Sequence, residues 1–176
     1  MMSIIYLFWM YVVLFGLIGS MRGWARELLV AFSVVTALAM NFLLKKYLPL
    51  MQELPGDSSS LFWIRSIIVL ALVFFGYQTI NILPRFESKA RRERLQDALF
   101  GFVLGGINGY LVAGTLLYYY HVGEYPYKEI ISKATDADTI ASIATMMKYM
   151  PPHFLGEPGI YFAPLIILIF IIVVYV

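Results

Sequence analysis

The chain has 176 residues, of which 61% are hydrophobic and only 14% are charged, and its formal net charge is +2. Soluble domains average about 45–50% apolar and about 25% charged residues, so this composition excludes an ordinary water-soluble fold. The sequence contains no cysteine, which excludes disulfides, thiol chemistry and cysteine-ligated metals. The small net charge gives no reason to expect a nucleic-acid partner. We expect the lipid bilayer to be the main partner.

Apolar segments predict an all-α, polytopic membrane protein with four core transmembrane helices and a fifth, C-terminal helix. The segments cover residues 4–19, 28–44, 61–83, 98–120 and 162–176. No Lys or Arg precedes the first segment, whereas the apolar region of a signal peptide follows a positively charged stretch. We therefore predict an uncleaved first span. The last segment, with two preceding residues, only just reaches the length needed to cross a bilayer.

A short charged turn joins the first two segments, in the sequence GLIGSMRGWARELL. Arg22 and Gly23 stand at the bend, and Arg26 and Glu27 begin the next helix. A carboxylate near a helix start is favourable to the helix dipole, and arginines suit lipid phosphates. The simplest interpretation is a tight cytoplasmic connection between two helices.

Small residues form a stripe on the predicted fourth span. Four residues spaced four apart share one face of that helix: Asp97, Gly101, Gly105 and Gly109. A glycine costs about 1 kcal/mol against alanine in an ordinary helix, so a row of them predicts close packing of another helix. We expect that helix to be the first span, where Gly16 and Gly19 offer a matching flat surface. A second copy of the chain is the alternative partner, which leaves a homo-oligomer open.

The densest group of basic residues precedes the fourth span. It consists of Arg85, Lys89, Arg91, Arg92 and Arg94. Positive charges concentrate in cytoplasmic loops, so we predict residues 20–27 and 84–97 on the cytoplasmic side and the N-terminus outside. Recognition of anionic lipid head groups is an alternative role for this basic loop. Asp97, at the end of the loop, either favours the helix dipole or forms an ion pair with Arg22 or Arg26.

The remaining part of the chain is polar up to residue 159. Residues 139–150 carry apolar side chains at helical spacing, which predicts an amphipathic helix on the outer membrane face or on the other spans. The expected organisation is a four-helix membrane domain at 1–121, an extramembrane loop with this amphipathic helix at 122–159, and a fifth transmembrane helix at 160–176.

The RGWARELL turn and the Asp97–Gly109 ladder together resemble the colicin V production protein family (CvpA-type bacterial inner-membrane proteins), over residues 4–120. Two positions depart from the family pattern. Ile4 and Ile5 stand where members often carry an acidic residue, and Asn108 stands where an arginine often precedes the last ladder glycine. The resemblance implies a multi-spanning protein of the bacterial inner membrane that is linked to colicin V production and envelope fitness.

No catalytic constellation is visible: the sequence has no GxSxG, no phosphate-binding GK[ST] and no pair of histidines at metal-ligand spacing. We therefore expect no enzyme activity, no catalytic residue, no cofactor and no metal. One function hypothesis is an assembly or partner-binding factor for toxin production, toxin export or envelope homeostasis, with an envelope or secretion protein as partner. The other is a small oligomeric channel or transporter built on the glycine-packed fourth helix, although few polar residues (Gln78, Asn81, Asn108) lie within the spans.

Overall fold

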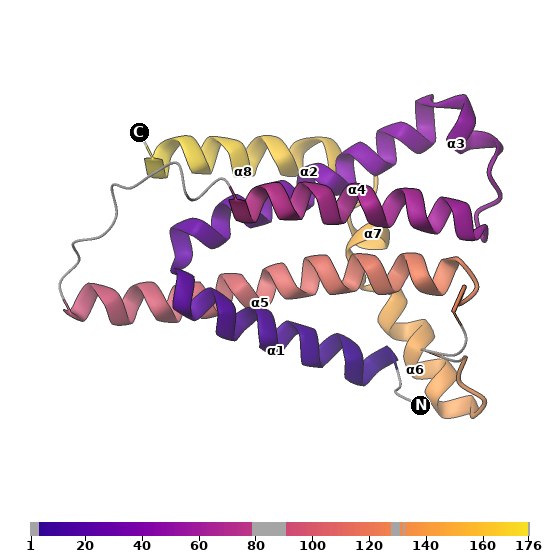
Figure 1. Ribbon diagram of the computed structural model, residues 1–176, viewed down its shortest axis with the longest axis horizontal. Helices are drawn as coiled ribbons and strands as arrows, with labels where there is room; N and C mark the ends of the chain where they lie inside the picture. The colour runs from indigo at the N-terminus through magenta and orange to yellow at the C-terminus, as the bar shows by residue number, and fades with distance from the viewer. Residues whose placement is uncertain (1–3, 79–90, 128–130, 132, 176) are drawn as a thin grey trace.

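The computed structural model describes residues 4–78, 91–127, 131 and 133–175, and within these ranges the side chains of all residues except 91–93 and 175. It consists of helices, and the described residues contain no strand. The helices are α1 (Ile4–Arg22), α2 (Trp24–Tyr47), α3 (Pro49–Glu53), α4 (Ser59–Gln78), α5 (Arg91–Val122), α6 (Ala137–Lys148), α7 (Pro151–Phe154) and α8 (Gly159–Tyr175). The predicted all-α class is confirmed (Figure 1).

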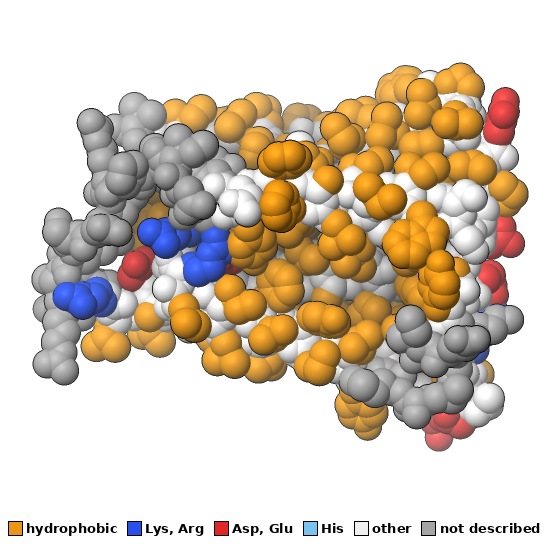
Figure 2. All heavy atoms as spheres, in the orientation of Figure 1, with side chains coloured by type: hydrophobic (Ala, Val, Ile, Leu, Met, Phe, Trp, Pro, Cys, Tyr) orange, Lys and Arg blue, Asp and Glu red, His pale blue; other side chains and the backbone are white. Residues whose placement is uncertain are grey.

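Four of these helices, α1, α2, α4 and α5, are long and apolar enough to cross a membrane. Their outward faces carry large apolar side chains: Trp9, Leu17 and Phe74 are each more than half exposed. Figure 2 shows hydrophobic side chains over the middle of the face and charged side chains at its two ends. A bilayer covers such a belt, whereas water would leave it unfavourably exposed. The chain is therefore a multi-pass membrane protein with the predicted four core spans.

The helix ends gather at two opposite ends of the molecule (Figure 1). The α1–α2 turn, the end of α4 and the start of α5 lie at one end, and the N-terminus, α3, α6 and the end of α5 lie at the other. α8 runs back along α2 toward the first end. It has 17 residues, which is the lower limit for spanning, and that it crosses the bilayer remains a prediction.

α5 begins seven residues before the predicted start at Ala98 and has 32 residues in all. At 1.5 Å per residue it is about 48 Å long, which exceeds the roughly 30 Å hydrocarbon core. Its first turns project beyond the α1–α2 turn (Figure 1). Part of the predicted basic loop is therefore helical. The predicted end of the third span, with Asn81, lies outside the described residues.

The most extensive contact between helices joins α1 and α5, and glycines bring the two backbones together. A methyl group on Gly105 would lie 2.4 Å from the Phe15 carbonyl oxygen and 2.9 Å from the Gly19 Cα. A methyl group on Gly19 would lie 2.2 Å from the Gly101 carbonyl oxygen. No side chain fits at these positions, because the neighbouring atoms belong to the backbone and cannot rotate away.

Further along the α1–α5 contact, Gly109 of α5 and Gly16 of α1 contact side chains as well as backbone. A methyl group on Gly109 would lie 2.9 Å from the Val12 Cα, and one on Gly16 would lie 3.1 Å from the Phe102 ring. The glycine stripe of α5 therefore faces α1 of the same chain.

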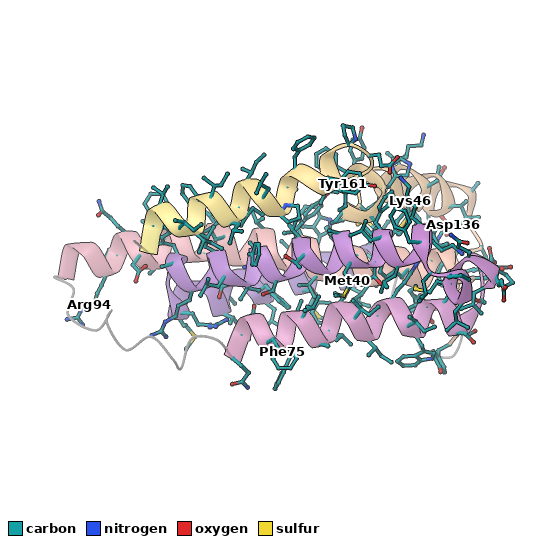
Figure 3. All side chains as sticks on the ribbon, turned by 90° about the horizontal axis from the view of Figure 1, so that it is seen from above. Met40, Lys46, Phe75, Arg94, Asp136 and Tyr161 are labelled. Carbon is teal, nitrogen blue, oxygen red and sulfur yellow. The ribbon has the colours of Figure 1, made fainter. Side chains whose placement is uncertain are left out.

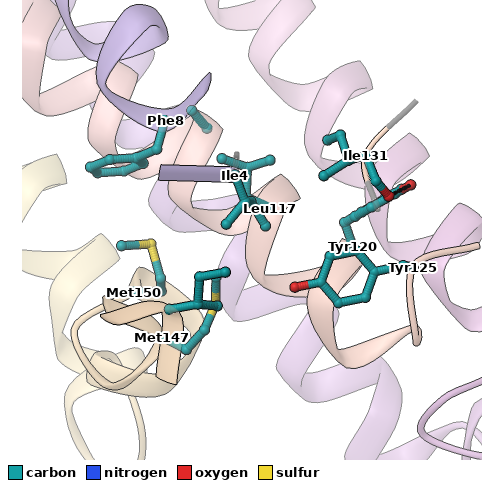
Figure 4. Close-up of a cluster of buried hydrophobic side chains, with 10 residues drawn as sticks. Ile4, Phe8, Leu117, Tyr120, Tyr125, Ile131, Met147 and Met150 are labelled. Carbon is teal, nitrogen blue, oxygen red and sulfur yellow. Dashed lines mark hydrogen bonds between the residues drawn. The ribbon is translucent and has the colours of Figure 1, made fainter. Parts of the chain in front are cut away.

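α6 closes the end of the bundle that holds the N-terminus. Ile143 and Met147 of α6 pack against Ile4 and Phe8 of α1 and against Leu117 of α5 (Figure 4). This helix matches the predicted amphipathic helix, and its N-terminus is capped by the Asp136 carboxylate. Its placement on the outer membrane face stays a prediction.

α7 lies beside the spanning part of α5, at Gly114. A methyl group there would lie 2.9 Å from Pro151 Cδ and 3.0 Å from Met150 Sδ. Gly114 precedes the end of α5 at Val122 by eight residues, which corresponds to about 12 Å along the helix axis. The segment that we predicted as an extramembrane loop thus folds back against the membrane-spanning helices.

Gly105 and Gly106 are adjacent on α5 and provide a matched pair. We expect Gly105→Ala to lower the free energy of unfolding by about 1–3 kcal/mol, because the methyl group must push α1 away. A methyl group on Gly106 would meet no described atom of another helix within 4 Å, so Gly106→Ala should be neutral or stabilise by up to about 1 kcal/mol through helix propensity. Thermal unfolding in detergent micelles measures both, and equal shifts for the two variants would contradict the packing described above.

Candidate functional site

The α1–α2 turn fits against α5 through Gly23 and Asp97. Gly23 has a φ of 86°, a left-handed conformation that favours glycine. A methyl group there would also lie 2.6 Å from an Asp97 carboxylate oxygen. Asp97 Oδ1 accepts a hydrogen bond of 3.1 Å from the Trp24 N–H, the first N–H of α2. A carboxylate from α5 thus occupies the positive end of the α2 dipole, where Gly23 offers no side chain as a cap.

One turn further along α2, Glu27 is completely buried. Its Oε1 forms an ion pair of 3.1 Å with Nη1 of Arg22, the last residue of α1. Asn108 of α5, also completely buried, donates through Nδ2 to Glu27 Oε2 and to the Glu27 carbonyl oxygen, both at 2.8 Å. The carboxylate therefore joins three helices.

An aromatic ring covers the ion pair from the α4 side. The Arg22 guanidinium lies 4.1 Å from the centre of the Tyr77 ring, a distance at which the face of the ring attracts the cation. Tyr77 stands near the end of α4, so all four core helices contribute to the arrangement. We call Arg22, Glu27, Tyr77 and Asn108 the Glu27 cluster.

Burial determines what the Glu27 cluster does. A buried carboxylate without compensation is strongly unfavourable, and here the compensation comes from Arg22, from the Asn108 amide and from the α2 N-terminus. The cluster fixes the relative positions of the helices only while each partner is present. Asn108 Oδ1 has no hydrogen-bond partner among the described residues, so one acceptor of the cluster is still unused.

The structure gives Arg22 a different partner from the one predicted. We predicted that Asp97 either favours the helix dipole or forms an ion pair with Arg22 or Arg26. Arg22 instead pairs with Glu27, Asp97 receives the Trp24 N–H, and Arg26 is exposed. The reason is geometric. Arg22 and Glu27 are five residues apart on either side of one tight turn, and the turn brings their side chains within ion-pair distance.

The predicted basic loop is described only in part. Arg85 and Lys89 lie outside the described residues, and the side chains of Arg91 and Arg92 are not described although their backbone belongs to α5. Arg94 is exposed on the projecting start of α5. It lies at the opposite end of the molecule from Lys46, which is near the end of α2 (Figure 3).

The sequence did not predict the burial of Glu27, the role of Asn108 or the presence of Tyr77. We placed Glu27 at the start of a helix in a tight charged turn, and we noted Asn108 only as a polar residue within the fourth span and as a departure from the family pattern. One signal was present: an ionisable side chain next to a long apolar run is expensive in a membrane and is paired as a rule. The spacing of 81 residues between Glu27 and Asn108 concealed the pair.

Nothing about the cluster indicates metal binding: among the described residues, no three acidic or histidine side chains form a group that could hold a metal. A model of the colicin V production protein family matches residues 5–148. The chain belongs to this family. The match extends beyond the 4–120 region of the predicted resemblance and includes α6, and every residue of the Glu27 cluster lies within it. No match was found among curated proteins or among solved structures.

Removing one partner of the buried ion pair tests the Glu27 cluster in this colicin V production family member. We expect Arg22→Met to lower the free energy of unfolding by about 3 kcal/mol, since it leaves a buried carboxylate without a counter-charge. Adding Glu27→Gln should restore part of the loss, because the buried charge is then removed. Equilibrium unfolding in mixed micelles gives these values.

The exposed Arg26 provides the control for that experiment. Arg26→Met removes the same charge from the same turn and should change stability by less than about 0.5 kcal/mol. Similar losses for Arg22→Met and Arg26→Met would mean that positive charge at the turn matters rather than the buried pair.

Proposed function

We propose that the protein acts in the bacterial inner membrane as an assembly or partner-binding factor in toxin production, toxin export or envelope homeostasis. In the proposed orientation, the α1–α2 turn and the start of α5 face the cytoplasm and the N-terminus lies outside. The positive charges of residues 20–27 and 84–97 support this orientation. The proposal includes no catalytic step, and the observation that carries it is the projecting start of α5.

The projecting start of α5 exposes an apolar stripe at the proposed cytoplasmic boundary. Leu95 and Leu99 are 66% and 67% exposed, and their spacing of four places them on one face of the helix. Leu95 precedes Asp97, which lies at the level of the α1–α2 turn. Exposed leucines beside basic residues at a helix end are suited to binding an amphipathic or acidic partner surface.

A groove next to this stripe extends the proposed binding surface. It has a volume of about 540 Å³ and lies between α2, α5 and α8, with Trp24, Phe100 and Phe170 among its lining residues. Aromatic side chains around an apolar groove are typical of interaction hot spots. An envelope or secretion protein that inserts a helix or an apolar side chain here would contact three helices of the bundle.

The alternative function, an oligomeric channel, depended on glycines that pack one copy against another. Gly101, Gly105 and Gly109 all lie against α1 of the same chain, so the stripe is occupied within a single copy. The buried polar side chains Glu27 and Asn108 bind each other and do not line a passage. These two observations favour the partner-binding role.

Substitution of the exposed leucines tests this role. In cells that lack the native protein, we expect the double variant Leu95→Ser/Leu99→Ser to reduce colicin V release and growth under detergent stress by about fivefold or more, because it removes an apolar contact. The level of the protein in the membrane should be unchanged, since both side chains are exposed.

Leu70 on α4 provides a matched control. It is 48% exposed on a lipid-facing span, and Leu70→Ser should leave both phenotypes intact. Full activity of the Leu95→Ser/Leu99→Ser variant, or equal losses for the α5 and α4 variants, would contradict a binding role for the start of α5.

A further inference from the structure

A cavity opens at the other end of the bundle, away from the Glu27 cluster. It has a volume of about 300 Å³ and lies between α2, α4, α5 and the α7–α8 region. Its polar walls come from Asn41, Lys45 and Lys46 of α2 and from Arg65 of α4, and its apolar walls come from residues such as Phe42 and Ile160. This size is at the lower end of the range for small-ligand sites.

Two of the three cations at this cavity have no counter-charge in the described part of the chain. Among the described residues, no carboxylate lies within ion-pair distance of Lys45 or Arg65. Lys45 Nζ donates to the carbonyl oxygens of Met51 and Leu54, at 2.7 and 3.1 Å. The Arg65 guanidinium lies 5.2 Å from the centre of the Tyr119 ring. Neither contact neutralises a positive charge.

Lys46 differs from its two neighbours, because it is neutralised within the chain. It forms an ion pair with Glu157, and the Tyr161 hydroxyl also donates to Glu157. Figure 3 shows Lys46 and Tyr161 side by side at the start of α8. The hydrogen bonds from Lys46 and Tyr161 hold the pKa of Glu157 below its usual range. The net positive charge of the cavity therefore comes from Lys45 and Arg65.

Asn41 lines the cavity, and its amide oxygen is a buried hydrogen-bond acceptor. Asn41 is only 2% exposed, and its Nδ2 donates to the Arg65 carbonyl oxygen at 3.1 Å. That bond fixes the orientation of the amide and directs Oδ1 elsewhere. Oδ1 has no partner among the described residues. A buried acceptor without a partner is unfavourable, and a hydroxyl group that reaches it from the cavity would satisfy it.

We propose that this cavity binds a phosphate ester that carries a free hydroxyl, in the form of the polyol-phosphate head group of a membrane phospholipid. Arg65 and Lys45 bind the phosphate, and Asn41 Oδ1 accepts a hydrogen bond from the head-group hydroxyl. A guanidinium binds phosphate oxygens with two parallel N–H donors.

The position of the cavity agrees with a lipid as the source. Lys45 belongs to the last turn of α2, and Arg65 lies in the first half of α4. Lys45 is at the depth of the head groups, and the long Arg65 side chain can extend from within α4 to that depth. Phe42 and Ile160 provide an apolar wall on which the first acyl carbons can lie.

Native mass spectrometry of the purified full chain tests the proposal with three lipids that differ only in the head group. Phosphatidylglycerol carries the phosphate charge and hydroxyls, phosphatidylmethanol carries the charge alone, and phosphatidylcholine has no net charge. We expect the protein to retain phosphatidylglycerol most strongly, phosphatidylmethanol less strongly and phosphatidylcholine least. This comparison needs no variant, so a folding defect cannot obscure it.

Variants then locate the site. Arg65→Gln should reduce phosphatidylglycerol retention by about tenfold, the usual effect of losing one charge-assisted hydrogen bond. Lys148→Gln, which removes an exposed charge from α6, should have no effect. Asn41→Leu should make the retention of phosphatidylglycerol equal to that of phosphatidylmethanol. Both lipids should still be retained more strongly than phosphatidylcholine.

Added glycerol phosphate distinguishes the two sources of this chemistry. Glycerol phosphate could bind with the same dependence on Arg65 while none of the three lipids binds. That result would confirm the phosphate ester as the recognised group but would show that the ligand is not a lipid. If all three lipids are retained equally, or if retention does not depend on Arg65 for any of these compounds, the proposal is overturned.

Discussion

The rest of the structure depends on the contact between the backbones of α1 and α5. Gly101 and Gly105 of α5 meet Gly19 of α1 so closely that no methyl group fits at these positions, and Gly109 lies against the backbone of Val12. This approach brings the α1–α2 turn to Asp97, and it brings Glu27 within hydrogen-bond distance of Asn108. In a bilayer the hydrophobic effect does not drive helices together, so close packing and buried polar contacts must do so. The protein uses both at the same place.

The two ends of the bundle have different electrostatic character. At the α1–α2 end the buried charge is balanced within the chain, because Glu27 has Arg22 and Asp97 has the N-terminus of α2. At the opposite end, Lys45 and Arg65 line a cavity without a described carboxylate partner. The first arrangement fixes the helices, and the second favours an anion from outside the chain. This difference is why we assign a structural role to one cluster and a binding role to the other.

The geometry of this colicin V production family member separates the groups that hold the helices together from the surfaces available for binding. The glycines of the α5 stripe pack within one copy, and Glu27 and Asn108 bind each other. The start of α5, the groove beside it and the basic cavity are exposed. We propose that these surfaces bind proteins and lipids. α7 reinforces the arrangement, because it packs against Gly114 and forms one side of the cavity.

The sequence by itself determined the class of protein, the four core spans and the face of α5 that carries the glycines. These properties follow from local composition and helical periodicity, which act over a few turns. Only the tertiary structure decided that Arg22 pairs with Glu27, that Asn108 completes the pair and that α7 folds back to Gly114. It also brought Asn41, Lys45 and Arg65 to one cavity. Except for the Arg22–Glu27 pair, which spans a single turn, these contacts join residues that are far apart in the chain. Helix packing, which no local pattern encodes, determines which of those residues meet.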